Sequence, residues 1–193
     1  LIPPYIEDIL VGLLLSDAGV QFANAKNKNA RLYFKQGLVN FPYFWYVFTV
    51  LSHYCSSFPN LISSVRNDKR SFGVQLQTRS LPCFTKFYSL FYINRIKVIP
   101  DDIFDLLTPA ALAHWIMGDG TKHYKRLILC TDSYSVEDVV RLMNVLIIRY
   151  ELDCTLQFHR PNQPRINIRT RSMPLLRSIV LPHMHCSMLY KIN

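Results

Sequence analysis

The chain has 193 residues, which is enough for one domain with a sizeable hydrophobic core. Half of the residues are hydrophobic and 13% are aromatic, so the composition excludes an intrinsically disordered protein. Lysine and arginine number 22 against 13 aspartates and glutamates, and the net charge of +9 indicates a polyanionic partner, nucleic acid before an anionic membrane surface. No apolar run is long enough to span a bilayer, so we expect no membrane partner.

The five cysteines are odd in number and widely spaced, and no two form a CxxC pair. They predict neither a zinc site nor a disulfide framework. We expect reduced, buried, small hydrophobic side chains at Cys55, Cys83, Cys130, Cys154 and Cys186.

The first half is predicted to alternate helices with pairs of strands. Pro3 and Pro4 favour a helix start, and polar turns at residues 27–29 and 66–70 each separate two strand-like segments. The predicted elements are a helix that ends with residues 10–18, strands 20–26 and 31–36, a helix over 41–55, strands 61–65 and 71–79, and a helix over 81–92.

The second half is predicted to repeat this order. Ser135 is a good N-cap, and two acidic residues follow it in the first turn of an amphipathic helix. The predicted elements are a helix that ends with residues 112–120, a turn at 122–125, a strand over 126–132, a helix over 135–150, strands 154–160 and 165–171, and a helix over 173–189 that is interrupted at Pro182.

Two pairs of matching segments indicate an internal duplication. Residues 10–18 (LVGLLLSDA) and 112–120 (LAHWIMGDG) are apolar helical runs that both end in a small residue, an aspartate and another small residue. Residues 75–80 (QLQTRS) and 167–172 (NIRTRS) match at a similar spacing. Two independent matches favour a duplicated unit over accidental similarity.

The duplication predicts an α+β fold of two αββαββα halves, residues 1–97 and 98–193, related by a pseudo-twofold axis. Small residues such as Gly12 would let the two motif helices pack closely at the centre. Two antiparallel sheets would then form a saddle. Packed in this way, the helices would bring Asp17 and Asp119 to the same edge of the molecule.

Two aspartates held together at helix C-termini repel each other, and the negative end of each helix dipole adds to this repulsion. Divalent cations would relieve it. Hard oxygen ligands with open positions suit Mg²⁺, which completes its shell with water and substrate phosphates. The alternative is two unrelated helix-ending aspartates, which the duplication disfavours.

Strand alternation predicts one polar, basic face on each sheet, opposite an apolar face that covers the helices. None of these strand faces carries an acidic residue, which favours nucleic-acid binding over an ordinary solvated face. The predicted contacts on strands are Arg31, Tyr33, Lys35, Gln75, Gln77, Arg79, Gln157, His159, Arg165, Asn167, Arg169 and Arg171. Those in or beside turns are Arg66, Lys69, Arg70, Lys122, Lys125, Arg126 and Arg160.

The two motif segments resemble the signature helices of the LAGLIDADG homing endonucleases, in the single-chain form with two motifs. The resemblance covers nearly the whole chain and implies the same two-halved fold. It assigns Asp17 and Asp119 as metal ligands, with Ala18 and Gly118 beside them in the metal site. It also implies Mg²⁺ as the cofactor, with Mn²⁺ as a substitute and Ca²⁺ binding without supporting cleavage.

The resemblance further implies one catalytic lysine in each half, Lys97 and Lys191. Gln77 matches a polar residue that helps to order water in the family. Its counterpart is Arg169, a departure from the family pattern that would make the two half-sites unequal.

The leading hypothesis is a monomeric, site-specific endonuclease that cuts a long, asymmetric double-stranded DNA site across the minor groove and leaves 3′ overhangs. One alternative is an RNA-binding maturase that assists splicing of its own intron. The other is a non-catalytic DNA-binding protein on the same fold. Both alternatives could lose an aspartate, whereas this chain keeps both. The resemblance implies an organellar, mitochondrial location.

Overall fold

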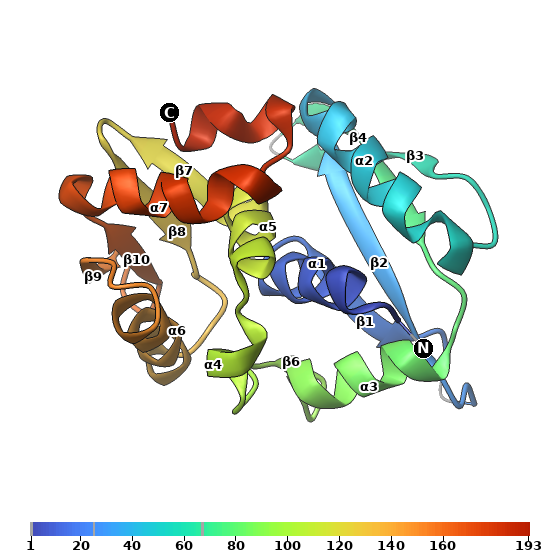
Figure 1. Cartoon of the computed structure of the whole chain (residues 1–193). Helices are drawn as coiled ribbons and strands as arrows, with labels where there is room; N and C mark the ends of the chain where they lie inside the picture. Colours follow the sequence, from blue (N-terminus) through green and yellow to red (C-terminus); the bar gives the residue numbers. More distant parts are fainter. Residues whose placement is uncertain (1, 25, 67) are drawn as a thin grey trace.

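The computed structural model describes residues 2–24, 26–66 and 68–193, with only the backbone at residues 66 and 69. Each half has the predicted order of helix, two strands, helix, two strands and helix (Figure 1). The first half contains α1 (Pro4–Leu15), β1 (Ala18–Phe22), β2 (Ala30–Gly37), α2 (Phe41–Leu51), β3 (Asn60–Arg66), β4 (Lys69–Gln77) and α3 (Pro82–Phe91). The second contains α5 (Pro109–Asp119), β7 (Gly120–His123), β8 (Arg126–Cys130), α6 (Val136–Ile148), β9 (Cys154–Phe158), β10 (Pro164–Ile168) and α7 (Met173–Val180).

A short hairpin and a one-turn helix connect the halves: β5 (Tyr92–Ile93), β6 (Ile96–Lys97) and α4 (Ile103–Leu106). β6 ends at Lys97, and the boundary between the repeats after this residue stays a prediction. Short 3-10 helices complete the chain: η1 (Leu38–Asn40), η2 (Ser52–Tyr54), η3 (Thr170–Ser172), η4 (Leu181–His183) and η5 (Cys186–Lys191). In the described ranges, no helix is both long and apolar enough to cross a membrane.

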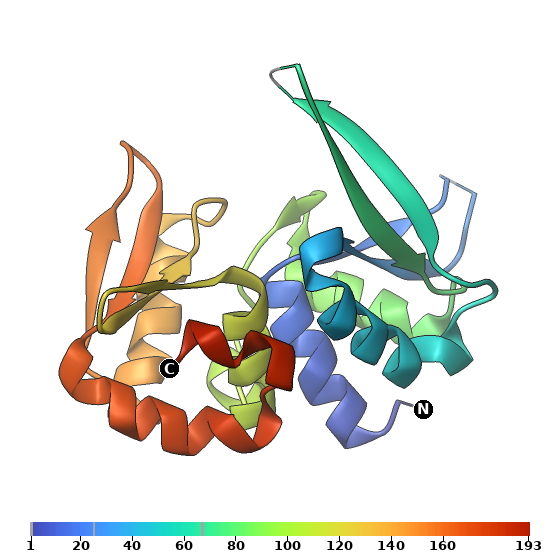
Figure 2. The same ribbon diagram turned by 90° about the horizontal axis from the view of Figure 1, so that it is seen from above.

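The two sheets have the same antiparallel topology, β1-β2-β4-β3 and β7-β8-β10-β9. Alternate residues are buried along each inner strand, for example Leu32 and Phe34 on β2 and Leu127 and Leu129 on β8. Figure 2 shows both outer hairpins, β3–β4 and β9–β10, projecting to one side of the molecule, with α1, α2 and α7 on the other. The predicted fold class and repeat are therefore confirmed.

The motif helices α1 and α5 pack against each other at the centre, as predicted (Figure 1). A β-carbon added to Gly12 would overlap the carbonyl oxygen of Ala111 and lie 2.5 Å from the β-carbon of His114. The absence of a side chain at Gly12 therefore allows the two backbones to approach closely.

We expect Gly12→Ala to lower the free energy of unfolding by about 2–3 kcal/mol, because the new methyl group would force the α1 and α5 backbones apart. Urea denaturation followed by circular dichroism would measure the change. Gly37→Ala is a matched control, because a β-carbon there would have its nearest neighbour 4.0 Å away, on Val39. Equal stability of the two variants would contradict the close helix contact.

His114 on α5 is buried at the junction of the two halves. Its Nδ1 lies 2.8 Å from the hydroxyl of Tyr43 on α2, and Tyr46 stacks on its ring. Burial, together with the neighbouring His183 and His185, lowers the pKa of His114 to about 3. His114 is therefore a packed histidine at the interface between the two halves.

The buried His114 is expected to make stability depend on pH. Above its unfolded pKa of about 6.5 the residue is neutral in both states, and its contribution is complete. As the pH falls toward 3, only the unfolded chain gains this proton, so stability should fall by about 1.4 kcal/mol per pH unit. Urea denaturation between pH 7 and pH 5 should show a smaller fall in the free energy of unfolding for His114→Gln than for the wild type. All other titrating groups are the same in the two proteins. Identical pH dependence would contradict this prediction.

Several element ends differ from the prediction. α1 ends at Leu15, because the Ser16 hydroxyl donates to the Gly12 carbonyl and the backbone leaves the helix before Asp17. β7 covers Gly120–His123, a strand absent from the prediction, so only residues 124 and 125 of the turn predicted at 122–125 form a turn. Of the cysteines expected to be buried, Cys154 is buried, Cys186 on η5 is exposed, and Cys55, Cys83 and Cys130 are half-buried.

The strands β4 and β10 end at Gln77 and Ile168, before the predicted ends at residues 79 and 171. In the second half, η3 begins at Thr170. Arg79 and Arg171 therefore lie beyond the strands, and strand alternation does not determine their orientation.

Candidate active site and nucleic-acid interface

The first motif aspartate, Asp17, lies in the short connection between α1 and β1. The side-chain amide of Gln36 donates to its Oδ2 at 2.5 Å, and Asn40 donates to Oε1 of Gln36 at 2.9 Å. Burial raises the pKa of Asp17, while the hydrogen bond from Gln36 and the charges of Lys191 and Lys97 oppose this rise. Asp17 is thus a solvent-accessible carboxylate held by an amide.

The second motif aspartate, Asp119, is the last residue of α5. Burial raises its pKa to about 7, and the negative charge of Asp17 contributes in the same direction. A β-carbon on the preceding Gly118 would lie 3.2 Å from Oδ2 of Asp17. The two carboxylates therefore come to one edge of the helix pair.

The donor set fits a hard divalent cation, because two close carboxylates offer oxygen ligands and would lose their mutual repulsion on binding it. Ala18 and Gly118 lie beside the aspartates, and their backbone carbonyls accept hydrogen bonds from lysines. Among the described residues, no three histidine, cysteine, aspartate or glutamate side chains form a closed metal site. Water and DNA phosphates would have to fill the remaining positions.

The two predicted lysines take similar places, although different elements carry them. Nζ of Lys97, on β6, donates to the carbonyl oxygens of Ser16 at 3.4 Å and Ala18 at 2.9 Å. Burial lowers the pKa of Lys97 to about 8, and the two aspartates oppose this shift.

Nζ of Lys191, on η5, donates to the carbonyl oxygens of Met117 at 2.6 Å and Gly118 at 2.9 Å. Burial also lowers the pKa of Lys191, with both aspartates opposing. Each lysine thus binds the backbone around one motif aspartate, Lys97 around Asp17 and Lys191 around Asp119.

The amide that contacts Asp17 is that of Gln36, which the sequence analysis did not single out. The water-ordering role expected of Gln77 stays a prediction. Gln77 pairs with Tyr33, which pairs with Gly19, so β2 separates Gln77 from the strand that follows Asp17. On β2, Gln36 alternates with Lys35 and shares the buried side of the strand with Phe34, and its side chain is 8% exposed. A glutamine on the core side of a strand was the signal in the sequence that could have identified it.

The second half has a different side chain at the position of Gln36. Phe34 pairs with Ala18, the residue after Asp17, and Leu129 pairs with Gly120, the residue after Asp119. Phe34 and Leu129 are therefore equivalent. Two residues further along the chain, Gln36 corresponds to Thr131. The Thr131 hydroxyl donates to the carbonyl of Pro164 at 2.6 Å. The two aspartates therefore have different neighbours, and the half-sites are unequal at this position.

The first sheet presents the predicted polar face beside Asp17. Lys35 pairs with Gln75, and Tyr33 with Gln77, so four predicted contacts form two rows across β2 and β4. A groove of about 290 Å³ runs from Asp17 past Lys35 to β3 and β4. Beyond the strand end, Arg79 donates to the His53 carbonyl at 2.6 Å, which holds its guanidinium at the end of η2.

The second sheet has a corresponding cavity of about 480 Å³, lined by the predicted Arg126, Gln157, Asn167, Arg169 and Arg171. Asn167 is buried, and its amide donates to the Thr155 hydroxyl at 3.2 Å.

Acidic residues from neighbouring loops lie against this second face, which the strand sequences alone did not indicate. Arg165 forms a two-pronged contact with Asp132, at 2.7 and 2.6 Å. Arg169 and Arg171 lie 3.5 and 2.5 Å from Asp153. The basic character of the second face is therefore partly neutralised.

The remaining predicted contacts lie on or near strands and hairpin turns. Arg31 alternates with the buried Ala30 and Leu32 on β2. The exposed ones are Arg70, Lys122, Lys125, His159 and Arg160. The side chains of Arg66 and Lys69 lie outside the described residues.

The sequence also matches a known family model. Its description is the LAGLIDADG DNA endonuclease family, and the match covers residues 7–176. The chain belongs to this family. The resemblance drawn from the two motif helices is thereby confirmed.

Among LAGLIDADG relatives, the chain is 30% identical over 193 residues to the cytochrome b mRNA maturase bI2 of Debaryomyces hansenii, covering 96% of this chain and 72% of that protein. It is 32% identical over 200 residues to the maturase bI2 of Saccharomyces cerevisiae, covering 97% of this chain and 47% of that protein. It is 29% identical over 195 residues to the "Probable intron-encoded endonuclease 1" of Wickerhamomyces canadensis, covering 96% and 83%. The chain thus spans about half the length of the Saccharomyces cerevisiae maturase.

Solved structures agree with this assignment. The homing endonuclease I-WcaI bound to its DNA recognition sequence matches with a TM-score of 0.92 and 28% identity, over 99% of this chain and 87% of that one. I-DmoI in complex with DNA and Mn matches with a TM-score of 0.57 and 14% identity, over 92% and 97%. The second match shows the shared LAGLIDADG fold.

Proposed function

We propose that this chain is a site-specific double-strand DNA endonuclease that depends on a divalent metal. The observation that carries the proposal is the pair Asp17 and Asp119, held at one edge of two packed helices between two polar sheet faces. Sheet side chains would bind a long, asymmetric duplex site and bring its minor groove to the aspartates, with cuts that leave 3′ overhangs. The single chain contains both halves, so we propose that it acts as a monomer.

Asp17 and Asp119 would hold the cation, with Mg²⁺ as the natural cofactor, Mn²⁺ as a substitute, and Ca²⁺ binding without cleavage. When bound, a divalent cation supplies activation of water and stabilisation of the leaving 3′ oxygen. Lys97 and Lys191 would place positive charge beside the scissile phosphates. Gln36 would orient the Asp17 carboxylate through its 2.5 Å hydrogen bond.

The second candidate function is RNA binding as a maturase for its own intron. Two relatives that match nearly the whole chain, at 30% and 32% identity, are cytochrome b mRNA maturases. The same relatives support an organellar, mitochondrial location. Intron RNA is therefore the second ligand to test.

The deciding experiment is cleavage of a plasmid library that carries randomised targets and intron-insertion junctions. Reactions at low salt would contain Mg²⁺, Mn²⁺ or Ca²⁺. We expect double-strand cuts at a few related sequences with Mg²⁺ or Mn²⁺, and binding alone with Ca²⁺. Binding without cleavage under all three conditions would reject the nuclease proposal and favour the maturase or a non-catalytic DNA-binding protein.

We expect Gln36→Leu to slow cleavage of one DNA strand about tenfold, because Asp17 would lose its hydrogen-bond donor while Asp119 would keep its surroundings. Differently labelled strands would reveal an accumulating nicked intermediate. Gln77→Leu is a comparison variant, since Gln77 is the predicted water-ordering residue and β2 separates it from the strand after Asp17. An equal or larger delay of the same DNA strand in Gln77→Leu would contradict the role given to Gln36.

A further inference from the structure

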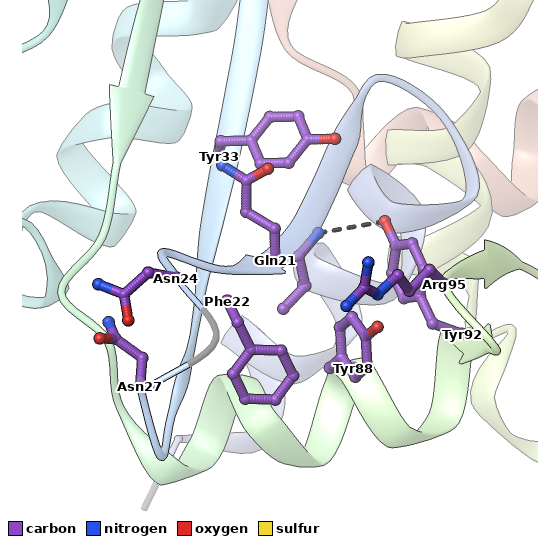
Figure 3. A pocket seen from close by; sticks show the side chains of 9 residues that line it. Gln21, Phe22, Asn24, Asn27, Tyr33, Tyr88, Tyr92 and Arg95 are labelled. Atoms are coloured by element: carbon purple, nitrogen blue, oxygen red, sulfur yellow. Dashed lines mark hydrogen bonds between the residues drawn. The ribbon is translucent and has the colours of Figure 1, made fainter.

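A cavity of about 720 Å³ lies outside the edge strand of the first sheet (Figure 3). β1 forms one wall, and the end of α3 and the β5–β6 hairpin form the opposite wall. The lining residues that the structure describes include four aromatic rings, three side-chain amides and one guanidinium, and none of them carries a carboxylate. This composition suits an anionic group attached to a flat or apolar ring.

The aromatic wall of the cavity is well ordered. Tyr88 stacks on Tyr92 with ring centroids 4.9 Å apart and nearly parallel planes, and Phe22 meets Tyr88 edge-on at 4.8 Å. The Tyr92 hydroxyl accepts a hydrogen bond from the backbone N–H of Val20 at 3.2 Å. The edge of β1 and the aromatic rings therefore hold each other in place. Little conformational entropy would then be lost when a ligand binds.

Arg95 supplies the only formal charge among the described residues of the cavity lining. It occupies the tight turn between β5 and β6 with a left-handed backbone (φ 67°), and its neighbour Asn94 has φ 50°. In Figure 3 its side chain extends from this turn toward the cavity. Within the described ranges, no carboxylate pairs with its guanidinium. A guanidinium free of carboxylates is a strong phosphate donor.

The β5–β6 hairpin links the wall of the cavity to the backbone beside Asp17. Tyr92 pairs with Lys97 across the β5–β6 hairpin, and Lys97 donates to the Ala18 carbonyl next to Asp17. Tyr33 lines the cavity and also belongs to the polar sheet face, with Lys35 Nζ 5.7 Å from its ring centroid. A duplex that lies on this face with a phosphate at Asp17 would pass the mouth of the cavity.

We propose that this cavity binds one sugar–phosphate unit of the DNA backbone beside the first-half cleavage centre. Arg95 would contact the phosphate, and Tyr88 and Tyr92 would line the sugar. The inference rests on the proposed function only in taking DNA as the ligand. In the second half, Lys191 lies on η5, and the described residues after α7 form no hairpin that could build a matching wall.

The test is fluorescence anisotropy with a labelled duplex of about 30 base pairs and random sequence, without metal, over a range of salt concentrations. We expect Arg95→Gln to bind about fivefold more weakly and to reduce the slope of log affinity against log salt by about 0.9, the value for one phosphate contact. Tyr88→Leu should bind about threefold more weakly with an unchanged slope, because it removes an aromatic contact and no charge.

Lys86→Gln is the matched control, since it also removes one positive charge from the first half. Lys86 is 66% exposed on α3 and pairs with Glu7 on α1, away from the cavity. We expect its salt slope to equal that of the wild type. An Arg95→Gln slope equal to that of Lys86→Gln would overturn the proposal. These measurements report binding alone, so a wild type that binds without cutting would contradict the nuclease proposal and leave the slopes interpretable.

Discussion

Asp17→Asn and Asp119→Asn are each expected to abolish double-strand cleavage, with a rate loss of about 10³-fold or more. Each change removes one of the two carboxylates that we propose as ligands of the metal. DNA binding in Ca²⁺ should fall much less, because the sheet faces supply most contacts. Cleavage of the selected target and anisotropy in Ca²⁺ would separate these two effects.

The same two variants should be more stable than the wild type when no metal is present. Asp17 raises the pKa of Asp119, so their charges oppose each other in the folded chain, and asparagine removes that repulsion. Thermal unfolding in a chelator would show a higher midpoint. Asp102→Asn, an exposed change at the start of α4, should alter neither cleavage nor stability. Wild-type cleavage by Asp119→Asn would reject the metal assignment.

Lys97→Met and Lys191→Met are expected to slow cleavage about 10²-fold each, because each removes a positive charge beside one aspartate. Lys97 binds the carbonyls around Asp17, and Lys191 binds those around Asp119. Each variant should therefore cut one DNA strand at the normal rate and the other slowly. The slowly cut strand should differ between the two variants. A target with differently labelled strands would show which cut is delayed.

Lys86→Met provides the control for loss of a lysine charge away from the site. If Lys97→Met and Lys191→Met delayed the same strand, the assignment of one lysine to each half-site would be wrong. If both cut at the wild-type rate, the lysines would serve only to hold the backbone around the aspartates.

The sequence by itself determined the repeat, the order of the elements and the two aspartates. These features depend on local patterns, namely apolar periodicity, turn residues and the matching motif segments. The lysines Lys97 and Lys191 came from family resemblance, since a lysine near a chain end has no distinguishing local pattern. The structure places both at the backbone next to the aspartates.

Only the tertiary structure decided which side chains meet across long stretches of sequence. Gln36 lies on the buried side of β2, yet packing brings its amide to Asp17 at the edge of the core. Alternation could not place Arg79 or Arg171 either, because the strands end before them.

The carboxylates that neutralise the second face, and the aromatic wall that closes the cavity on β1, come from segments far away in the chain. Arg165 meets Asp132 from another element, and Tyr92 reaches the N–H of Val20. Such contacts depend on how helices and sheets pack against one another. That packing is set by the summed burial of many residues, which no local pattern contains.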